Sequence, residues 1–224
     1  MGDAPTALSM TRFNVGIDSF MIPFLNSLFL RTKMPLVLKR NINPHTLLSI
    51  WEMNEALDFF LQSGIFLPKT LQNNKRKREW IASRLLLRVL APNTTISYNE
   101  FGAPILSDGR AISITHSNDY CCLLISPNKA SIDLELITEK AHRLKKKFVS
   151  EEEEKLLTQS DRATLAWCAK ECLFKLHQKG KIIFKEDLHL KSFTPNTIET
   201  TLNGDPYLLN YEKFKGHYLV YYYE

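Results

Sequence analysis

The sequence lacks an apolar segment long enough to cross a membrane. Its most apolar stretch near the start, FMIPFLNSLFL at 20–30, has eleven positions and is interrupted by Pro23 and Asn26, whereas a membrane-spanning helix needs about 20 residues. A small-residue cleavage site and the usual basic n-region are also missing, although Arg12 precedes the stretch. We therefore expect no membrane partner and no cleaved signal, and a disordered N-terminal extension over 1–33, unless translation starts at Met34.

Cysteine is also scarce. The four cysteines occur as the adjacent pair Cys121 and Cys122 and as Cys168 and Cys172, which are four residues apart. Adjacent cysteines rarely bridge each other, and an i, i+4 pair within a helix suits packing better than a disulfide. A lone C-x-x-x-C with no second pair nearby is a weak indication of a metal site. We expect all four to be reduced and mostly buried, which favours a cytoplasmic protein.

No glycine- or proline-rich linker divides the chain, and its hydrophobic fraction of 44% is that of an ordinary globular protein. Helices followed by antiparallel strands are predicted twice, over about 45–127 and 129–223. We therefore predict an α+β fold of two similar halves, 34–127 and 128–224. The expected strands are 45–53, 95–106 (a hairpin turning at Gly102), 111–117, 120–126, 129–137, 181–184, 188–193, 197–202 and 216–223, and the expected helices are 54–62 with Asn54 as N-cap, 74–91, 139–147, 150–159 and 162–178.

Positive charge is clumped along the chain. The net charge is only +5, yet KRKR at 75–78 and KAHRLKKK at 140–147 contain nine of the 29 lysine and arginine residues. Such clumps favour phosphate-rich or acidic partners. Solvated helix faces explain either clump equally well when it is taken alone.

Two groups of side chains could bind a phosphate. On the predicted helix 74–91, a rotation of 100° per residue places Lys77, Arg84 and Arg88 within about 40° of one another, and guanidinium groups bind phosphate oxygens in a bidentate fork. Thr115 and His116 lie where a strand ends in the turn ITHSN, and both can donate hydrogen bonds to an anion. A solvated stripe and a structural histidine are the alternatives.

Two carboxylates share one face of the predicted strand SIDLELI. Asp133 and Glu135 are two residues apart, so both side chains point to one side of the strand while the apolar residues between them point to the other. Like charges this close repel unless a cation lies between them, and Mg²⁺ typically takes one or two carboxylates together with substrate phosphates. The pattern indicates a magnesium site, and the solvent face of an edge strand is the alternative.

The segment WCAKECLFK at 167–175 combines charge with a helical apolar face. On a helical wheel Glu171 and Lys175 lie together at one margin of that face, whereas Trp167 and Phe174 occupy the opposite side with Lys170 beside them. A Glu–Lys pair at this spacing is usually a surface salt bridge. At a core margin facing a metal, the same pair can supply one metal ligand and one phosphate clamp.

Taken in order, these motifs resemble the 4'-phosphopantetheinyl transferase superfamily in its longer, two-half form, which activates synthetase and fatty-acid carrier domains. That form has a G-x-D-x-E strand and a W-x-x-K-E-A/S-x-x-K helix, preceded by an S-H-S turn. The chain departs from these signatures at Ser131, Thr115 and Cys172, and none of the departures removes a charge. The resemblance covers Met34 to the C-terminus and implies a pseudo-dimer within one chain, active as a monomer, with the site in the cleft between its halves.

The resemblance also implies an activity. The family uses coenzyme A (CoA) and Mg²⁺ to move the phosphopantetheine arm onto a serine of an acyl, aryl or peptidyl carrier protein, an acidic partner, and releases adenosine 3',5'-bisphosphate. By motif match, Asp133, Glu135 and Glu171 would hold Mg²⁺ against the CoA pyrophosphate, and Lys175 would neutralise that pyrophosphate. The 3'-phosphate and its surroundings would be bound by His116, Thr115, Arg84 and Arg88 or Lys77. Glu153 in FVSEEEE aligns with a carboxylate proposed as the general base, and Glu171 is a rival for that role.

Two other readings remain at the level of sequence. A nucleic-acid-binding module would use the two basic clumps as phosphate contacts, but it would leave Asp133, Glu135 and Glu171 without a role. A catalytically inactive relative could keep only the ability to bind carrier proteins. We favour the transferase, with no nucleic acid as partner.

Overall fold

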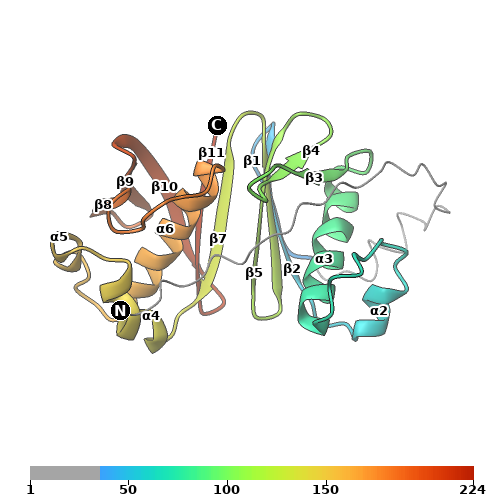
Figure 1. Ribbon diagram of the computed structural model, residues 1–224, viewed down its shortest axis with the longest axis horizontal. Coiled ribbons are helices and arrows are strands. Elements are labelled where there is room, and N and C mark those ends of the chain that lie inside the picture. The colour runs from blue at the N-terminus through green and yellow to red at the C-terminus, as the bar shows by residue number, and fades with distance from the viewer. Residues whose placement is uncertain (1–35) are drawn as a thin grey trace.

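The computed structural model describes residues 36–224, in which two antiparallel sheets pack face to face between helices (Figure 1). The first sheet has the strand order β1-β2-β6-β5 and the second the order β7-β11-β10-β9-β8. The first contains β1 (Leu36–Asn43), β2 (Thr46–Glu52), β5 (Ala111–Ser117) and β6 (Tyr120–Ser126). The second contains β7 (Ala130–Leu136), β8 (Leu188–Phe193), β9 (Thr197–Leu202), β10 (Asp205–Phe214) and β11 (His217–Tyr223).

A short hairpin and six helical segments complete the described part of the chain. The hairpin pairs β3 (Ile96–Tyr98) with β4 (Pro104–Leu106). The helical segments are α2 (Leu57–Leu61), α3 (Asn74–Leu90), α4 (Glu139–Leu144), the 3₁₀ turn η1 (Lys145–Lys147), α5 (Glu151–Glu154) and α6 (Arg162–His177). The longest, α3, starts where the Asn73 side chain accepts a hydrogen bond from the Arg76 backbone N–H at 3.2 Å.

Apolar side chains form three successive layers of core. One lies between α3 and the first sheet, and another lies between α6 and the second sheet. The third lies between the two sheets and contains Leu48, Ile50, Cys122, Leu124, Ala130, Ile132, Leu134 and Leu219. Figure 1 accordingly shows α3 and α6 on opposite sides of the paired sheets, with β5 and β7 near each other between them. This arrangement brings the end of β5 next to the acidic strand β7.

Most predicted elements are confirmed, and the α+β class with antiparallel sheets is correct. The predicted strands 111–117 and 120–126 match β5 and β6, and the hairpin does turn at Gly102, which has φ 82°. All four cysteines are free and buried, as expected. The expectation for residues 1–33 lies outside the described residues.

Three predictions about local structure are wrong or incomplete. Asn54 does not cap a helix, because α2 begins later, after Ala56, whose side chain cannot cap. Residues 181–184 form no strand, since Lys181 has φ 57° and the Ile183 N–H donates to the Asp187 carboxylate at 2.7 Å in a turn. The strands β1 and β10 had no sequence prediction; both carry charged or polar residues along much of their length, and β10 has a proline in its second position.

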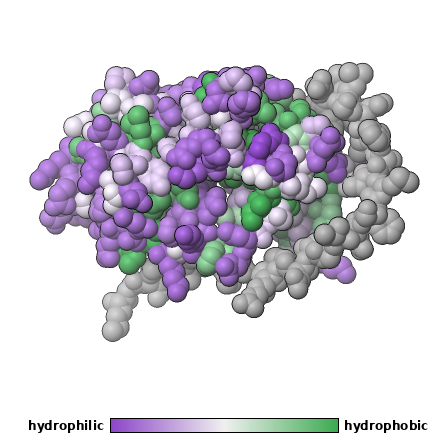
Figure 2. Space-filling model, turned by 90° about the horizontal axis from the view of Figure 1, so that it is seen from above, coloured by the Kyte–Doolittle hydropathy of each residue, from purple (hydrophilic) through white to green (hydrophobic). Residues whose placement is uncertain are grey.

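Within residues 36–224, every helix is too short or too polar to cross a bilayer. The face seen from above in Figure 2 is mostly hydrophilic, and its hydrophobic residues appear as small separate areas.

Candidate functional site

The candidate site forms where β5 and β7 meet. The Thr115 hydroxyl on β5 donates to Asp133 Oδ1 on β7 at 3.0 Å, and Ser113 Oγ accepts from the Ile132 N–H at 3.0 Å. Alternation along β7 turns Asp133 towards α6, as the sequence predicted, while Ile132 enters the core between the sheets. The acidic face of β7 is therefore covered by α6 rather than exposed to solvent.

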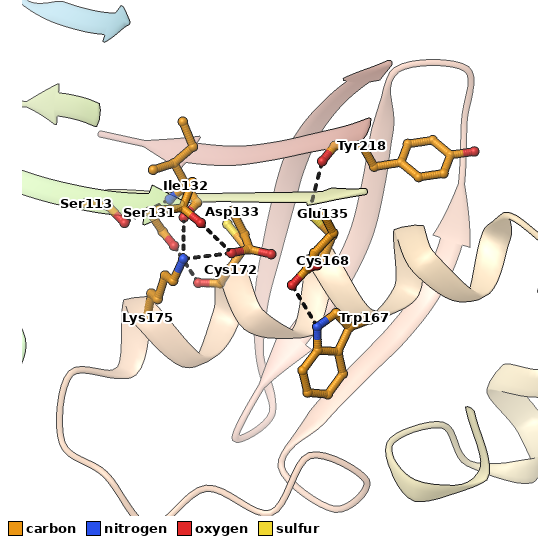
Figure 3. A network of polar contacts seen from close by, with 11 residues as sticks. Ser113, Ser131, Ile132, Asp133, Glu135, Trp167, Cys168, Cys172, Lys175 and Tyr218 are labelled. Atoms are coloured by element: carbon orange, nitrogen blue, oxygen red, sulfur yellow. Dashed lines mark hydrogen bonds and ion pairs between the residues drawn. The ribbon is translucent and has the colours of Figure 1, made fainter. Parts of the chain in front are cut away.

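Lys175 on α6 is the cation that faces this strand. Its ammonium donates to Asp133 Oδ1 at 2.7 Å and to the Ile132 carbonyl at 2.9 Å, as Figure 3 shows. Burial lowers the pKa of Lys175, but the charge and hydrogen bond of Asp133 outweigh burial, so the pKa is raised overall. Lys175 is therefore firmly protonated.

Three carboxylates lie near the Lys175 ammonium. Burial, followed by the charge of Asp133, raises the pKa of both Glu135 and Glu171 to about 7. The Trp167 indole N–H donates to Glu135 Oε1 at 3.0 Å and opposes part of the rise for Glu135. The acids thus lie close enough to repel one another and carry more negative charge than Lys175 can balance.

The donor set suits a divalent cation, although its side chains have not yet converged. Among residues 36–224, no three His, Cys, Asp or Glu side chains already stand in positions that could hold a metal ion. Asp133 Oδ2, however, is buried without a hydrogen-bond partner, and such an atom is costly unless something binds it. Three oxygen-donor acids with an excess of negative charge fit Mg²⁺ by type, with Glu135 and Glu171 moving to join Asp133.

His116 lies near the end of β5, next to Thr115 in the chain, and is influenced by several cations. Burial, followed by the charge of Lys175 and with smaller effects from Arg76 and Arg84, lowers the pKa of His116 to about 3. Its Nε2 atom is buried and has no hydrogen-bond partner in the described chain. A neutral imidazole among three cations is a suitable receptor for an anion.

The structure brings only part of the predicted cation row to His116. Arg84 contributes, and so does Arg76, which the sequence singled out only as a member of the KRKR clump. Lys77 and Arg88 lie on the same helix, but their charges are not among the largest effects on the pKa of His116. Thr115 binds Asp133, so its contact positions the acid.

Glu153 and Lys170 form a buried ion pair away from this group of acids. Lys170 Nζ lies 2.8 Å from Glu153 Oε2 and donates to the Phe184 carbonyl at 2.9 Å. The same carboxylate accepts from the backbone N–H groups of Ser150 and Leu190, both at 2.7 Å. These contacts of the Glu153 carboxylate are therefore structural.

The helical wheel placed Lys170 beside Trp167 and Phe174, away from the apolar face, but the structure buries it. Its side chain is fully buried, because the face of α6 that carries Trp167 is covered by Phe148 and Phe184, with ring centroids 5.0 and 5.4 Å from that of Trp167. The helical wheel could not predict this covering layer, since its residues come from loops before and after the helix.

A comparison of the chain with protein-family models finds no match, and neither does a comparison with curated proteins.

The buried His116 makes a testable contribution to acid sensitivity. Its pKa in the folded state, about 3, lies below its ordinary value near 6.5, so the unfolded chain binds a proton first as the pH falls. Wild type should therefore lose stability relative to His116→Gln between about pH 6.5 and pH 3. Urea unfolding of both proteins at pH 7 and pH 5 checks this, and an unchanged difference between them would contradict it.

Proposed function

We propose that the protein is a Mg²⁺-dependent 4'-phosphopantetheinyl transferase that uses coenzyme A to modify a serine of an acidic acyl or peptidyl carrier protein. The observation that carries the proposal is the group of three carboxylates around Lys175, in which Asp133 Oδ2 is buried and unbonded. Beside it lie His116 and the cations of α3. One molecule with two separate phosphate groups, a pyrophosphate and a monoester, suits both parts.

Asp133, Glu135 and Glu171 would hold the metal. When bound, Mg²⁺ would neutralise the pyrophosphate and polarise its phosphorus–oxygen bonds. The Thr115 hydroxyl would hold Asp133 in place, whereas Glu135 would move towards it from its present hydrogen bond with the Trp167 indole N–H. Lys175 would shift from Asp133 Oδ1 towards a pyrophosphate oxygen, since the metal would then share the charge of Asp133.

The 3'-phosphate would lie against His116 and α3. A neutral His116 with its proton on Nε2 donates one hydrogen bond, and Arg84 supplies charge-assisted hydrogen bonds. An incoming phosphate would also offset the positive charges of Lys175, Arg76 and Arg84, which lower the pKa of His116.

Glu171 is the favoured general base. The serine oxygen of the carrier forms a bond to the phosphorus nearer the pantetheine, the bond from that phosphorus to the bridging oxygen breaks, and adenosine 3',5'-bisphosphate leaves. The serine proton would pass to the Glu171 carboxylate. The pKa of Glu171 is about 7 without the metal, and a bound cation would lower it, so that Glu171 would be ionised and able to accept the proton at neutral pH.

The wider organisation follows from the same proposal. The two similar halves, 34–127 and 128–224, would form a pseudo-dimer within one chain, and a monomer in the cytoplasm would be active. In line with this, the strand before the helices pairs with the last strand in each sheet, β2 with β6 and β7 with β11.

The test is incubation with CoA, Mg²⁺ and a panel of apo carrier proteins, followed by intact-mass measurement. A carrier that gains one phosphopantetheine group supports the proposal. CoA binding without transfer to any carrier would indicate an inactive relative, and salt-sensitive binding to arbitrary DNA with no CoA binding would favour the nucleic-acid reading.

Arg84→Ala should impair the use of CoA selectively. Loss of a charge-assisted contact costs about 1.5–3 kcal/mol, so KM for CoA should rise on the order of tenfold or more, with a much smaller change for 3'-dephospho-CoA. Steady-state kinetics with both substrates measure this, with Arg88→Ala as the control on the same helix. An equal loss with both substrates would show that Arg84 acts elsewhere.

A further inference from the structure

The Arg84 guanidinium is held by aromatic and neutral groups. Its central carbon lies 3.3 Å from the centre of the Trp80 ring and 5.6 Å from that of Tyr98. Nη2 donates to the Tyr98 hydroxyl at 2.7 Å, and Nη1 donates to Ser83 Oγ at 2.9 Å and to the Trp80 carbonyl at 3.2 Å. The Trp80 and Tyr98 rings are nearly parallel, with centroids 6.0 Å apart.

This environment differs from that of Arg76 and Arg78 on the same helix. Arg76 is paired with the Glu79 carboxylate at 3.1 Å and Arg78 with Asp119 at 2.5 Å. Within residues 36–224, Arg84 makes no ion pair, and none of its hydrogen bonds uses the Nε–H. Its charge is therefore held in place without being neutralised.

Aromatic partners suit an arginine that binds an anion better than carboxylate partners do. A carboxylate would fix the guanidinium equally well, but it would repel an incoming phosphate and compete for the same N–H groups. A ring face and a phenol oxygen restrict the side chain through a cation–π contact and a hydrogen bond to a neutral acceptor. They leave the net positive charge and the Nε–H available.

The hairpin that carries Tyr98 is itself anchored. The Asn99 side chain donates to the Gln178 carbonyl at 3.1 Å, just beyond α6, and Phe101 packs against Gly180, where an added Cβ would lie 3.5 Å from the Phe101 ring. Tyr98 is thus fixed relative to both α3 and the end of α6. Arg84 is held between two elements that do not move independently.

We propose that Trp80 and Tyr98 are positioning residues that fix Arg84 for a phosphate monoester and so set the preference for substrates with a 3'-phosphate. This inference rests on the proposed function and names the residues that govern selectivity at its monoester subsite. Neither aromatic side chain needs to touch the substrate, because both act through the orientation of Arg84.

The experiment compares wild type with Tyr98→Phe, which removes one hydroxyl from a side chain on an exposed strand. Calorimetry gives the affinity for adenosine 3',5'-bisphosphate and for adenosine 5'-monophosphate, and kinetics give KM for CoA and 3'-dephospho-CoA. Tyr98→Phe should weaken the binding of the 3'-phosphorylated ligands by about threefold to tenfold, the range expected for the loss of one hydrogen bond. The binding of the ligands without a 3'-phosphate should be unchanged. Trp80→Leu should act in the same direction. The control, Tyr207→Phe, alters a tyrosine beside Lys129 in the other part of the chain.

The outcomes separate this inference from the proposed function. A wild type that prefers the 3'-phosphate, together with a Tyr98→Phe variant that keeps the full preference, would overturn the positioning role alone. Equal weakening of both classes of ligand would also overturn it, because that result marks a structural role. A wild type that binds neither adenosine bisphosphate nor CoA would overturn both.

Discussion

Glu171→Gln is expected to lower turnover by at least about a hundredfold, the scale of losing a key electrostatic contact at an active site. The amide keeps the shape of the side chain but can neither accept the serine proton nor bring a charge to the metal. The Mg²⁺-dependent rise in melting temperature in the presence of CoA should disappear with it. Intact-mass kinetics and thermal unfolding measure the two effects.

The same variant should be more stable than wild type without ligands at pH 8. The pKa of Glu171 is about 7 in the folded state, above the ordinary value near 4.3, so the folded chain binds more protons in that interval and stability falls as the pH rises through it. The gain from Glu171→Gln should therefore be larger at pH 8 than at pH 5, on the order of a few °C in melting temperature.

The exposed Glu151 on α5 supplies the control. Glu151→Gln should leave both turnover and Mg²⁺ dependence unchanged. If Glu171→Gln retains near-normal turnover, or loses stability at pH 8, then the acidic group on β7 and α6 is not a metal site.

Lys170→Met should destabilise the protein by about 3–5 kcal/mol, because it leaves Glu153 buried without its counter-charge. Both side chains are almost inaccessible to solvent, at 0% and 3% exposure, so water cannot replace the lost ammonium. Urea unfolding at pH 7 measures the change. Lys213→Met, which breaks an exposed pair with Asp161, should have little effect.

A double variant separates the buried charge from the packing of the side chains. Lys170→Met combined with Glu153→Gln removes both charges and keeps an oxygen that can accept from the Leu190 N–H. It should recover more than half of the stability lost in Lys170→Met. Failure to recover would mean that the ion pair contributes little and that Lys170 is needed for its shape or for its bond to the Phe184 carbonyl.

The relative positions of the candidate site residues could be predicted from sequence where they depend only on the local geometry of one strand or helix. Asp133 and Glu135 share a face because strand side chains alternate with a period of two, which requires no knowledge of the rest of the fold. Lys175 lies one turn from Glu171 for the same kind of reason. The cysteines were also placed correctly, since their spacing offered no partner for a disulfide.

The sequence predicted less well the surroundings of residues whose contacts come from distant parts of the chain. A helical wheel places Lys170 beside Trp167, opposite the apolar face, but Glu153 from α5 and Phe148 and Phe184 from loops enclose it. Arg76 stands beside His116 only because β5 packs near α3, and nothing in the KRKR clump marks which of its cations faces inward. In the same way, the ring that holds Arg84 belongs to a hairpin 14 residues further along the chain.

The bond between Thr115 and Asp133 has a consequence for molecular length. It joins the edge strands of two separate sheets, and its partners adjoin His116 in the chain and bind Lys175, so the packing of these two strands sets the span between the two proposed phosphate positions. The two strands therefore select ligands by the distance between their two phosphate groups. A ligand with a different distance could fill one position or the other, but not both at once.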